Sequence, residues 1–189
     1  MKQGFVKVAS ATPRIRVADP VYNAQVICEQ AKEAAEHGAK IVVFPELCIT
    51  GYTCNDLFLQ ELLLEKAKEA LLTIAEETGQ LETLFLVGLP VDKDGRLYNV
   101  AAVLYRGRIL GMIPKKNIPM YAEFYEGRHF TPGEETVTEY RLGKQVIPFG
   151  SNLLFRCEEL PELILGCELC EDLWVAAVSY THLRAHETK

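Results

Sequence analysis

Three side chains that could take part in covalent chemistry lie just past the ends of apolar, strand-like segments. Glu46, Lys115 and Cys170 each follow such a segment, although they are far apart in the sequence. In α/β sheets, side chains beyond the strand ends gather in a common crevice where ligands bind. A carboxylate, an ammonium and a thiol in one crevice would supply a proton acceptor, a positive charge and a nucleophile. From position alone, Glu46 and Lys115 could equally be solvated loop charges, and Cys170 an inert buried thiol.

A pair of nearby cysteines leaves a second chemistry open. Cys167 and Cys170 have C-x-x-C spacing, which is typical of metal-binding or redox-active thiols, so a non-catalytic thiol protein is a separate hypothesis. A zinc ribbon needs a second such pair, and the spacing of Cys48 and Cys54 fits poorly. A cysteine–histidine nucleophile would use His129 as its base and would leave the carboxylate and the ammonium without roles. The sequence therefore favours a site without a metal.

Strands and helices alternate along the chain and would position these residues. Helices are predicted over 20–37, with Asp19 as N-cap and Gly38 beyond the end, and over 56–78, with Gly79 beyond the end. Strands are predicted at 5–10, 39–44, 84–88, 97–104, 108–113, 151–156 and 163–169, with a hairpin turn at Arg106-Gly107. This order predicts an α/β layered domain with mixed strand pairing.

The composition is that of an ordinary globular domain. The chain has 189 residues, 49% hydrophobic and 24% charged, which allows one domain with a substantial core. A formal net charge of −6 predicts no surface for nucleic acid. The apolar runs are too short to cross a bilayer and the N-terminus does not resemble a signal peptide, so we expect a cytoplasmic protein without a membrane partner. The six cysteines are then expected to be reduced thiols.

The segments around the three candidate residues resemble the signatures of the carbon–nitrogen hydrolase (nitrilase) superfamily. They are Phe44–Tyr52, Pro114–Pro119 and Cys170–Trp174. Within that superfamily, Thr50–Phe58, Tyr121–Phe130 and again Cys170–Trp174 are similar to the glutamine amidotransferase domain of glutamine-dependent NAD synthetases. The resemblance runs from the first predicted strand to about Trp174 and implies an α/β fold of the αββα sandwich type.

The resemblance also implies hydrolysis of the side-chain amide of glutamine through a cysteine thioester. Cys170 would attack the amide carbon, while Glu46 would receive the thiol proton, pass it to the departing ammonia and later activate water. Lys115 would lower the pKa of the thiol and stabilise the developing oxyanion. Glu171 would bind the α-amino group of the substrate and Tyr121 would contact it. Glu126 would orient Lys115.

Ordinary alternatives remain for these last three residues and for the activity itself. Glu171 and Glu126 could be surface charges, and Tyr121 could be a packing residue. In the same fold, a stand-alone amidase or nitrilase would act on another amide or nitrile. The sequence downstream of Trp174 would separate these activities, because a synthetase domain should follow only in the first case.

The resemblance finally bears on the extent of the domain. We expect a partial hydrolase domain over residues 1–177, without the later strands of the family domain and with poor activity, followed by a non-native tail over 178–189. The synthetase domain that would use ATP and Mg²⁺ is expected to be absent, so no cofactor is expected on this chain. The expected partners are glutamine, a C-terminal synthetase domain in a longer parent chain, and further copies of the chain in a homo-oligomer.

Overall fold

The computed structural model describes residues 5–175, and the predicted tail at 178–189 lies outside the described residues. The helical elements are α1 (Pro20–Glu36), η1 (Tyr52–Leu59), α2 (Glu61–Glu77), η2 (Glu126–Arg128) and α3 (Glu171–Trp174), where η denotes a 3₁₀ helix. The strands are β1 (Val8–Ser10), β2 (Ile41–Val43), β3 (Leu84–Lys93), β4 (Arg96–Tyr105), β5 (Arg108–Pro114), β6 (Thr138–Leu142), β7 (Gln145–Phe149), β8 (Phe155–Arg156) and β9 (Ile164–Leu165).

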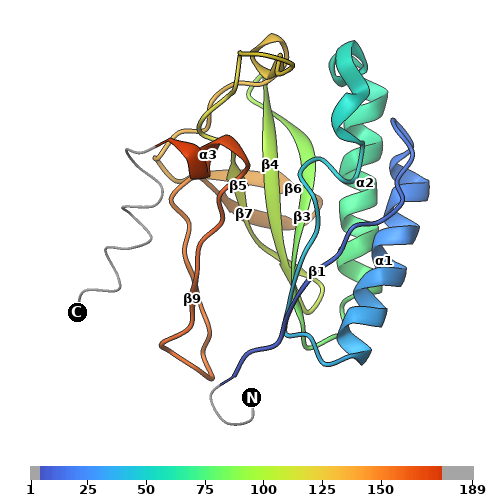
Figure 1. The fold of residues 1–189 in the computed structure, drawn as a ribbon, viewed down its shortest axis with the longest axis vertical. Coiled ribbons are helices and arrows are strands. Elements are labelled where there is room, and N and C mark those ends of the chain that lie inside the picture. Colours follow the sequence, from blue (N-terminus) through green and yellow to red (C-terminus); the bar gives the residue numbers. More distant parts are fainter. Residues whose placement is uncertain (1–4, 176–189) are drawn as a thin grey trace.

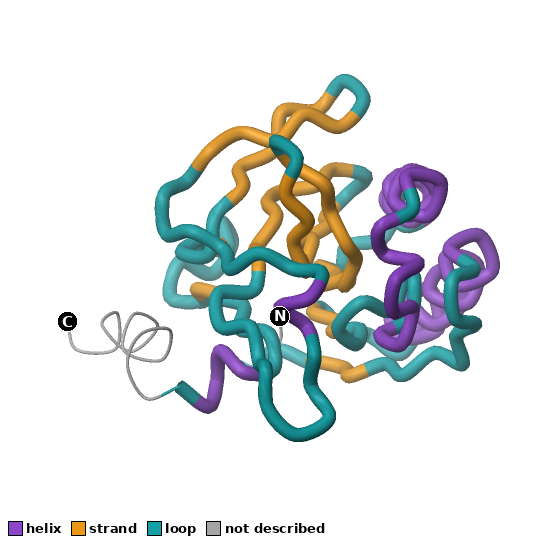
Figure 2. Tube along the Cα trace, turned by 90° about the horizontal axis from the view of Figure 1, so that it is seen from above, coloured by secondary structure: helices purple, strands orange, loops and turns teal. Residues whose placement is uncertain are grey.

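Seven of the strands form one mixed sheet in the order β1-β2-β3-β4-β5-β7-β6 (Figure 1). Strands β1, β2 and β3 are parallel, and α1 and α2 make the connections between them. Strands β3, β4 and β5 are antiparallel hairpins, as are β6 and β7. The two helices lie side by side on one face of the sheet (Figures 1 and 2). The predicted mixed α/β domain is therefore confirmed.

Helix α1 shows how local sequence sets the element boundaries. The Asp19 side chain accepts a hydrogen bond from Tyr22 N at 3.1 Å, and Pro20 occupies the first turn, where its missing N–H costs nothing. Gly38 has a φ of +82°, which a glycine adopts without strain, and the helix ends just before it. The predicted helix and the observed one agree to within a residue.

The predicted helix over 56–78 is wrong at its start. Residues 52–59 form η1, and α2 begins only at Glu61. Asn55 has a φ of +50°, which interrupts any regular helical path. Asp56 does not cap a helix, because its carboxylate pairs with Arg128 at 2.7 Å. A contact that is distant in the sequence thus overrides the local helical pattern.

Each face of the sheet is buried against a different partner. On β4, Val100, Ala102 and Leu104 belong to the core that includes the apolar faces of α1 and α2. The alternate residues Ala101 and Val103 face the opposite side. Leu153, Phe155 and Leu169 pack there, beside the small β8–β9 sheet (Figure 1). The predicted strands at 151–156 and 163–169 are much shorter in the structure.

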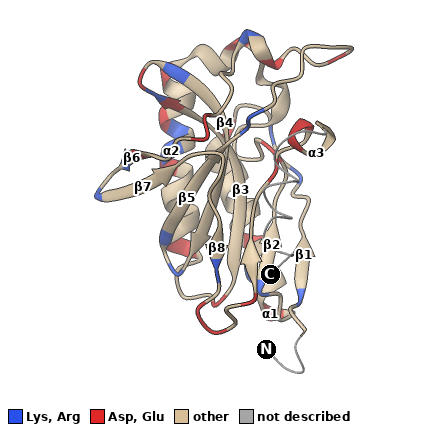
Figure 3. Cartoon of the chain, turned by 90° about the vertical axis from the view of Figure 1, so that its left-hand side faces the viewer, with Lys and Arg blue, Asp and Glu red and all other residues tan. Residues whose placement is uncertain are grey.

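Charged residues lie mostly outside these two cores. In the view of Figure 3, both signs of charge follow the helices and loops, whereas the central strands β3 and β5 are nearly free of charge. Within residues 5–175, no helix combines the length and apolarity that crossing a membrane requires. The buried exceptions to this charge pattern are collected at one end of the sheet, and they form the candidate site.

Candidate active site

Glu46 lies in a tight turn directly after β2, and the turn rests on β3. A Cβ atom at Gly88 would lie 2.3 Å from the backbone N of Leu47 and 2.7 Å from the carbonyl oxygen of Pro45. Only a glycine allows so close an approach between the strand and the turn. Within the turn, the Leu47 backbone has a φ of +52°, in the left-handed region that non-glycine residues seldom adopt. This packing fixes the backbone that carries the Glu46 carboxylate.

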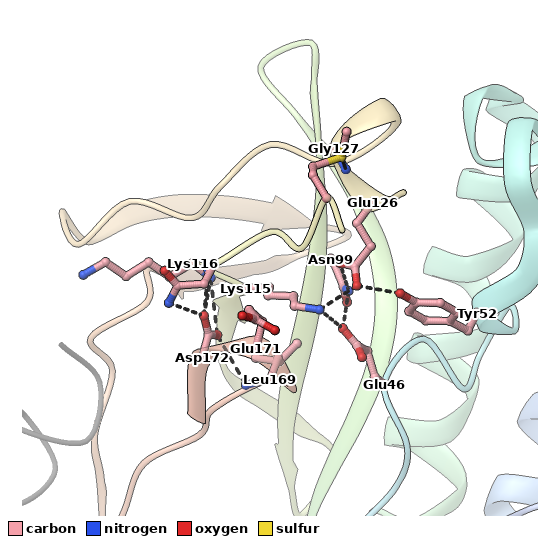
Figure 4. Close-up of polar contacts among 12 residues, drawn as sticks. Glu46, Tyr52, Asn99, Lys115, Lys116, Glu126, Gly127, Leu169, Glu171 and Asp172 are labelled. Carbon is pink, nitrogen blue, oxygen red and sulfur yellow. Dashed lines mark hydrogen bonds and ion pairs between the residues drawn. The ribbon is translucent and has the colours of Figure 1, made fainter. Parts of the chain in front are cut away.

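Lys115 follows β5 and is the buried centre of the site. Its backbone N–H donates to the carbonyl of Asn99 at 2.8 Å, and its side chain is 0% exposed. The ammonium donates to Glu46 Oε1 at 2.8 Å and to Glu126 Oε1 at 2.7 Å (Figure 4). Burial alone would lower the pKa of Lys115, but the hydrogen bonds to Glu126 and Glu46 outweigh it and raise the pKa. The ammonium is therefore charged at neutral pH.

Two further side chains complete this cluster. Tyr52 donates to Glu126 Oε1 at 2.7 Å, and Asn99 donates through Nδ2 to Glu46 Oε1 at 2.6 Å (Figure 4). Burial raises the pKa of Tyr52, and the hydrogen bond and charge of Glu126 raise it further, so the phenol stays a donor. Neither residue had a predicted role. Asn99 did carry a signal, because an asparagine amid the apolar residues of a buried strand is unusual.

Cys170 lies between β9 and α3 in a sparsely populated backbone conformation. Its φ is +46° and its ψ −99°, and the residue is exposed. A non-glycine residue at positive φ is strained, and such strain is concentrated at functional sites. The conformation presents the thiol at the start of the short helix α3.

Several charges act on the Cys170 thiol. Partial desolvation raises its pKa, the Lys115 ammonium lowers it, and the Glu46 and Glu126 carboxylates raise it again. The net direction is upward. We expected Lys115 to lower the thiol pKa; its charge does act in that direction, but desolvation and the two carboxylates outweigh it. The Cys170 thiol therefore lies within the electrostatic reach of the other two candidate residues, and its pKa is raised.

Asp172 connects the lysine loop to the cysteine turn. This buried carboxylate accepts from the backbone N–H of Asn117 at 2.7 Å and from the Asn117 side chain at 2.9 Å. It also accepts from the backbone N–H groups of Lys116 and Leu169 (Figure 4). No role was predicted for Asp172. Its hydrogen bonds tie the residue after Lys115 to the residue before Cys170.

The two residues predicted to contact substrate lie together beside Cys170. The Tyr121 hydroxyl donates to Glu171 Oε2 at 2.7 Å, and this hydrogen bond raises the pKa of Tyr121. Tyr121 is exposed, and Glu171 directly follows the cysteine. On the side of Tyr52 and Glu126, a pocket of about 350 Å³ borders the cluster. Glu46, Lys115 and Cys170 are not among the residues that line this pocket.

Cys48 and Cys167 are less exposed than Cys170. Burial raises the pKa of Cys48 to about 12 and that of Cys167 to about 12. Among residues 5–175, no group of three or more His, Cys, Asp or Glu side chains could hold a metal ion. The cluster offers instead a thiol, a carboxylate with an adjacent ammonium, and hydrogen-bond donors. This set suits nucleophilic attack on an electrophilic carbon with transfer of the thiol proton.

Comparison with known proteins assigns the fold and site to a class. Residues 7–188 match the carbon–nitrogen hydrolase family, so the chain belongs to that family of enzymes. An amidase from Nesterenkonia sp. has the same fold, with a TM-score of 0.57 and 24% identity over 76% of this chain and 54% of that one. The predicted superfamily and fold class are therefore confirmed.

Within the family, the chain is similar to glutamine-dependent NAD(+) synthetases. It is 39% identical over 174 residues to that of Mycobacterium tuberculosis, which is 92% of this chain and 26% of the relative. The crystal structure of the Cytophaga hutchinsonii enzyme superposes with a TM-score of 0.81 and 29% identity, over 88% of this chain and 28% of that one. The chain thus spans about a quarter of the length of these relatives.

Proposed function

We propose that this chain hydrolyses the side-chain amide of glutamine and supplies ammonia to a synthetase domain of a longer NAD synthetase. The observation that carries the proposal is the wholly buried Lys115 ammonium, which is hydrogen-bonded to Glu46 and Glu126 and whose charge acts on the Cys170 thiol. The similarity to glutamine-dependent NAD(+) synthetases supports the choice of glutamine.

The first half of the reaction forms a thioester. The Cys170 sulfur attacks the amide carbon while its proton moves to Glu46. Both hydrogen bonds that Glu46 makes among the described residues use Oε1, so Oε2 is available as the acceptor. Lys115 supplies the positive charge that stabilises the oxyanion. The C–N bond then breaks, Glu46 gives the proton to the departing nitrogen, and ammonia leaves.

The second half releases glutamate. Glu46 takes a proton from a water molecule as the water oxygen attacks the thioester carbon. The C–S bond breaks, and the sulfur receives the proton that Glu46 holds. Glu126 and Tyr52 take no proton in this scheme, because they serve to hold the ammonium in place. The carboxylate of Glu171, with Tyr121, would bind the α-amino group of the substrate by a charge-assisted hydrogen bond.

The use of ammonia belongs to the partner domain in this proposal. ATP and Mg²⁺ chemistry is assigned to that domain, a choice that the similarity to NAD(+) synthetases supports. The chain itself would need only glutamine and water. Its immediate products would be glutamate and ammonia.

Labelling with an electrophilic glutamine analogue tests the proposal. The chain is incubated with 6-diazo-5-oxo-L-norleucine and the adduct is mapped by mass spectrometry. We expect modification of Cys170, protection by glutamine, and no adduct in Cys170→Ala. Modification of Cys48 or Cys167 instead would mean that another thiol is the nucleophile.

Competition with other ligands separates the alternatives. Protection by a short aliphatic amide or nitrile, without protection by glutamine, would favour a stand-alone amidase or nitrilase. Stoichiometric zinc in the purified chain, lost in Cys167→Ser, would favour the metal-binding thiol protein. Either result would contradict the proposed glutamine hydrolysis.

A further inference from the structure

Asn99 is a buried polar residue in the middle of β4. Its neighbours along the strand are mostly apolar residues, and Asn99 itself is 0% exposed. Nδ2 donates to Glu46 Oε1 at 2.6 Å and lies 3.5 Å from Glu126 Oε2 (Figure 4). The carbonyl oxygen Oδ1 has no hydrogen-bond partner among the described residues. The amide nitrogen thus contacts both carboxylates, and the amide oxygen is left without a hydrogen bond among the described residues.

Fold stability does not account for this amide. A buried acceptor without a partner destabilises the folded state, whereas leucine, of similar shape, would fill the position without that cost. The opposite orientation of the amide would place a carbonyl oxygen against carboxylate oxygens, which are all acceptors. The NH₂ group therefore faces the carboxylates, and its contact with Glu46 is the short one.

This contact decides which oxygen of Glu46 is free. Asn99 and Lys115 both donate to Oε1, so the two donors fix the rotation of the carboxylate. Oε2 is left to accept a proton. We propose that Asn99 is a positioning residue that holds Glu46 in the orientation that receives the Cys170 proton. This inference rests on the proposed function, because it assumes that Glu46 acts as the base.

The experiment measures acylation of Cys170 by p-nitrophenyl acetate, which does not depend on glutamine recognition. The sulfur bonds to the acetyl carbon, the thiol proton moves to Glu46 and nitrophenolate leaves. The part of the nitrophenolate burst that Cys170→Ala abolishes reports on the site. We expect Asn99→Leu to slow this part about tenfold or more, the effect of losing one hydrogen bond to a charged group. With glutamine as substrate, kcat should fall similarly while KM stays within about twofold.

Asn99→Asp tests the amide nitrogen separately from the amide oxygen. It keeps an oxygen at the unpaired position, but replaces the donor with an oxygen that repels Glu46 and Glu126. We expect this variant to be at least as slow as Asn99→Leu. Acylation at the wild-type rate in Asn99→Asp would overturn the assignment, because the nitrogen donor would then be dispensable.

Asn23→Leu is the matched structural control. Asn23 is also 0% exposed, but its amide hydrogen-bonds only to backbone atoms of Arg16 and Ile49 and contacts neither carboxylate. We expect Asn23→Leu to lower Tm more than Asn99→Leu does and to slow the burst less. An unchanged burst rate in Asn99→Leu would overturn the positioning role. So would a fall in burst rate no larger, for the same fall in Tm, than the fall in Asn23→Leu.

The same measurements distinguish this inference from the proposed function. A Cys170-dependent burst that Asn99→Leu slows, in a chain whose Cys170 glutamine does not protect from acylation or labelling, would support the role of Asn99 and contradict glutamine as substrate. Glutamine hydrolysis that Asn99→Leu leaves intact would contradict only the role of Asn99. A burst that Cys170→Ala does not change would contradict both.

Discussion

At the scale of single residues, two consecutive lysines lie in very different surroundings. The Lys115 side chain is fully buried between Glu46 and Glu126, whereas the Lys116 side chain is partly exposed and pairs with Glu135 at the surface. A buried charge is tolerated only when it is paired, and each partner then depends on the other. Lys115 therefore holds two carboxylates in a place that neither would occupy alone.

Replacement of Lys115 should destabilise the fold as well as abolish catalysis. Lys115→Met leaves two carboxylates close together and partly or fully buried, so we expect a loss of about 3–5 kcal/mol in the free energy of unfolding. Lys116→Met removes an exposed pair and should cost at most about 1 kcal/mol. Urea unfolding of both variants measures the difference. Equal losses would show that Lys115 is not the centre of a buried charge cluster.

Replacing Glu46 with Gln should speed alkylation of Cys170 and abolish glutamine hydrolysis. Glu46 raises the pKa of the thiol, so Glu46→Gln should lower it and increase the thiolate fraction below that pKa. At about pH 8, below the raised pKa of the wild-type thiol, alkylation by iodoacetamide should then be faster in Glu46→Gln, by up to about tenfold per unit of pKa. Glutamine hydrolysis should be lost, because the base is gone. Slower alkylation would mean that the variant has displaced the thiol.

The site residues differ in how far the sequence reveals them. Glu46, Lys115 and Cys170 follow strand-like segments and lie in recognisable motifs. Tyr52 and Asn99 act through hydrogen bonds to residues 74 and 53 positions away, and no local pattern encodes such contacts. These partners become visible only when the fold brings η1 to η2, and β4 to the turn after β2.

At the scale of elements, short-range signals set most boundaries. The hairpin at Arg106-Gly107 is confirmed, with both residues at positive φ, as a tight two-residue turn requires. Asp94-Gly95 makes the same kind of turn between β3 and β4, a signal that the prediction overlooked. The hairpin of β6 and β7 also went unpredicted, and no periodicity fixed the long loop before it.

The contact between β3 and the Glu46 turn gives a prediction at this scale. Gly88→Ala places a Cβ against the backbone of residues 45–47, so the turn must move and carry Glu46 away from Lys115. We expect at least about a hundredfold loss of kcat, since small displacements of catalytic groups have effects of this order. Steady-state kinetics and thermal melting measure activity and stability together.

Gly143→Ala is the control for that variant. Gly143 has a φ of +57° in the β6–β7 hairpin, but a Cβ there meets no atom within 4 Å. It should cost about 1 kcal/mol of stability, through backbone strain alone, and leave activity intact. If Gly88→Ala lost no more activity than Gly143→Ala, the packing of the turn on β3 would not position Glu46.

At the scale of the whole molecule, the two faces of the large sheet pack against apolar cores of different size. The helical face has a large core made with α1 and α2. On the other face, β8 and β9 have two residues each, pair only with one another among the described residues, and pack through a smaller apolar cluster. Cys170 follows this small sheet, whereas Glu46 and Lys115 belong to the large one. Cys170 is therefore carried by a unit with a smaller apolar cluster than the unit that carries Glu46 and Lys115.

Two cysteines, the buried Cys48 and the partly buried Cys167, can report on these units separately. Cys167 belongs to the segment under β8–β9, and Cys48 lies beside β3 in the helical core. Burial raises the pKa of each to about 12, so neither should react until its surroundings open. In pulsed alkylation with increasing urea, we expect Cys167 to become labelled at a lower urea concentration than Cys48, because regions with fewer buried contacts open first. The exposed Cys170 should be labelled throughout and serves as the internal reference. Coincident labelling of Cys167 and Cys48 would show instead that both faces of the sheet unfold as one cooperative unit, and the nucleophile would then be held as firmly as its partners.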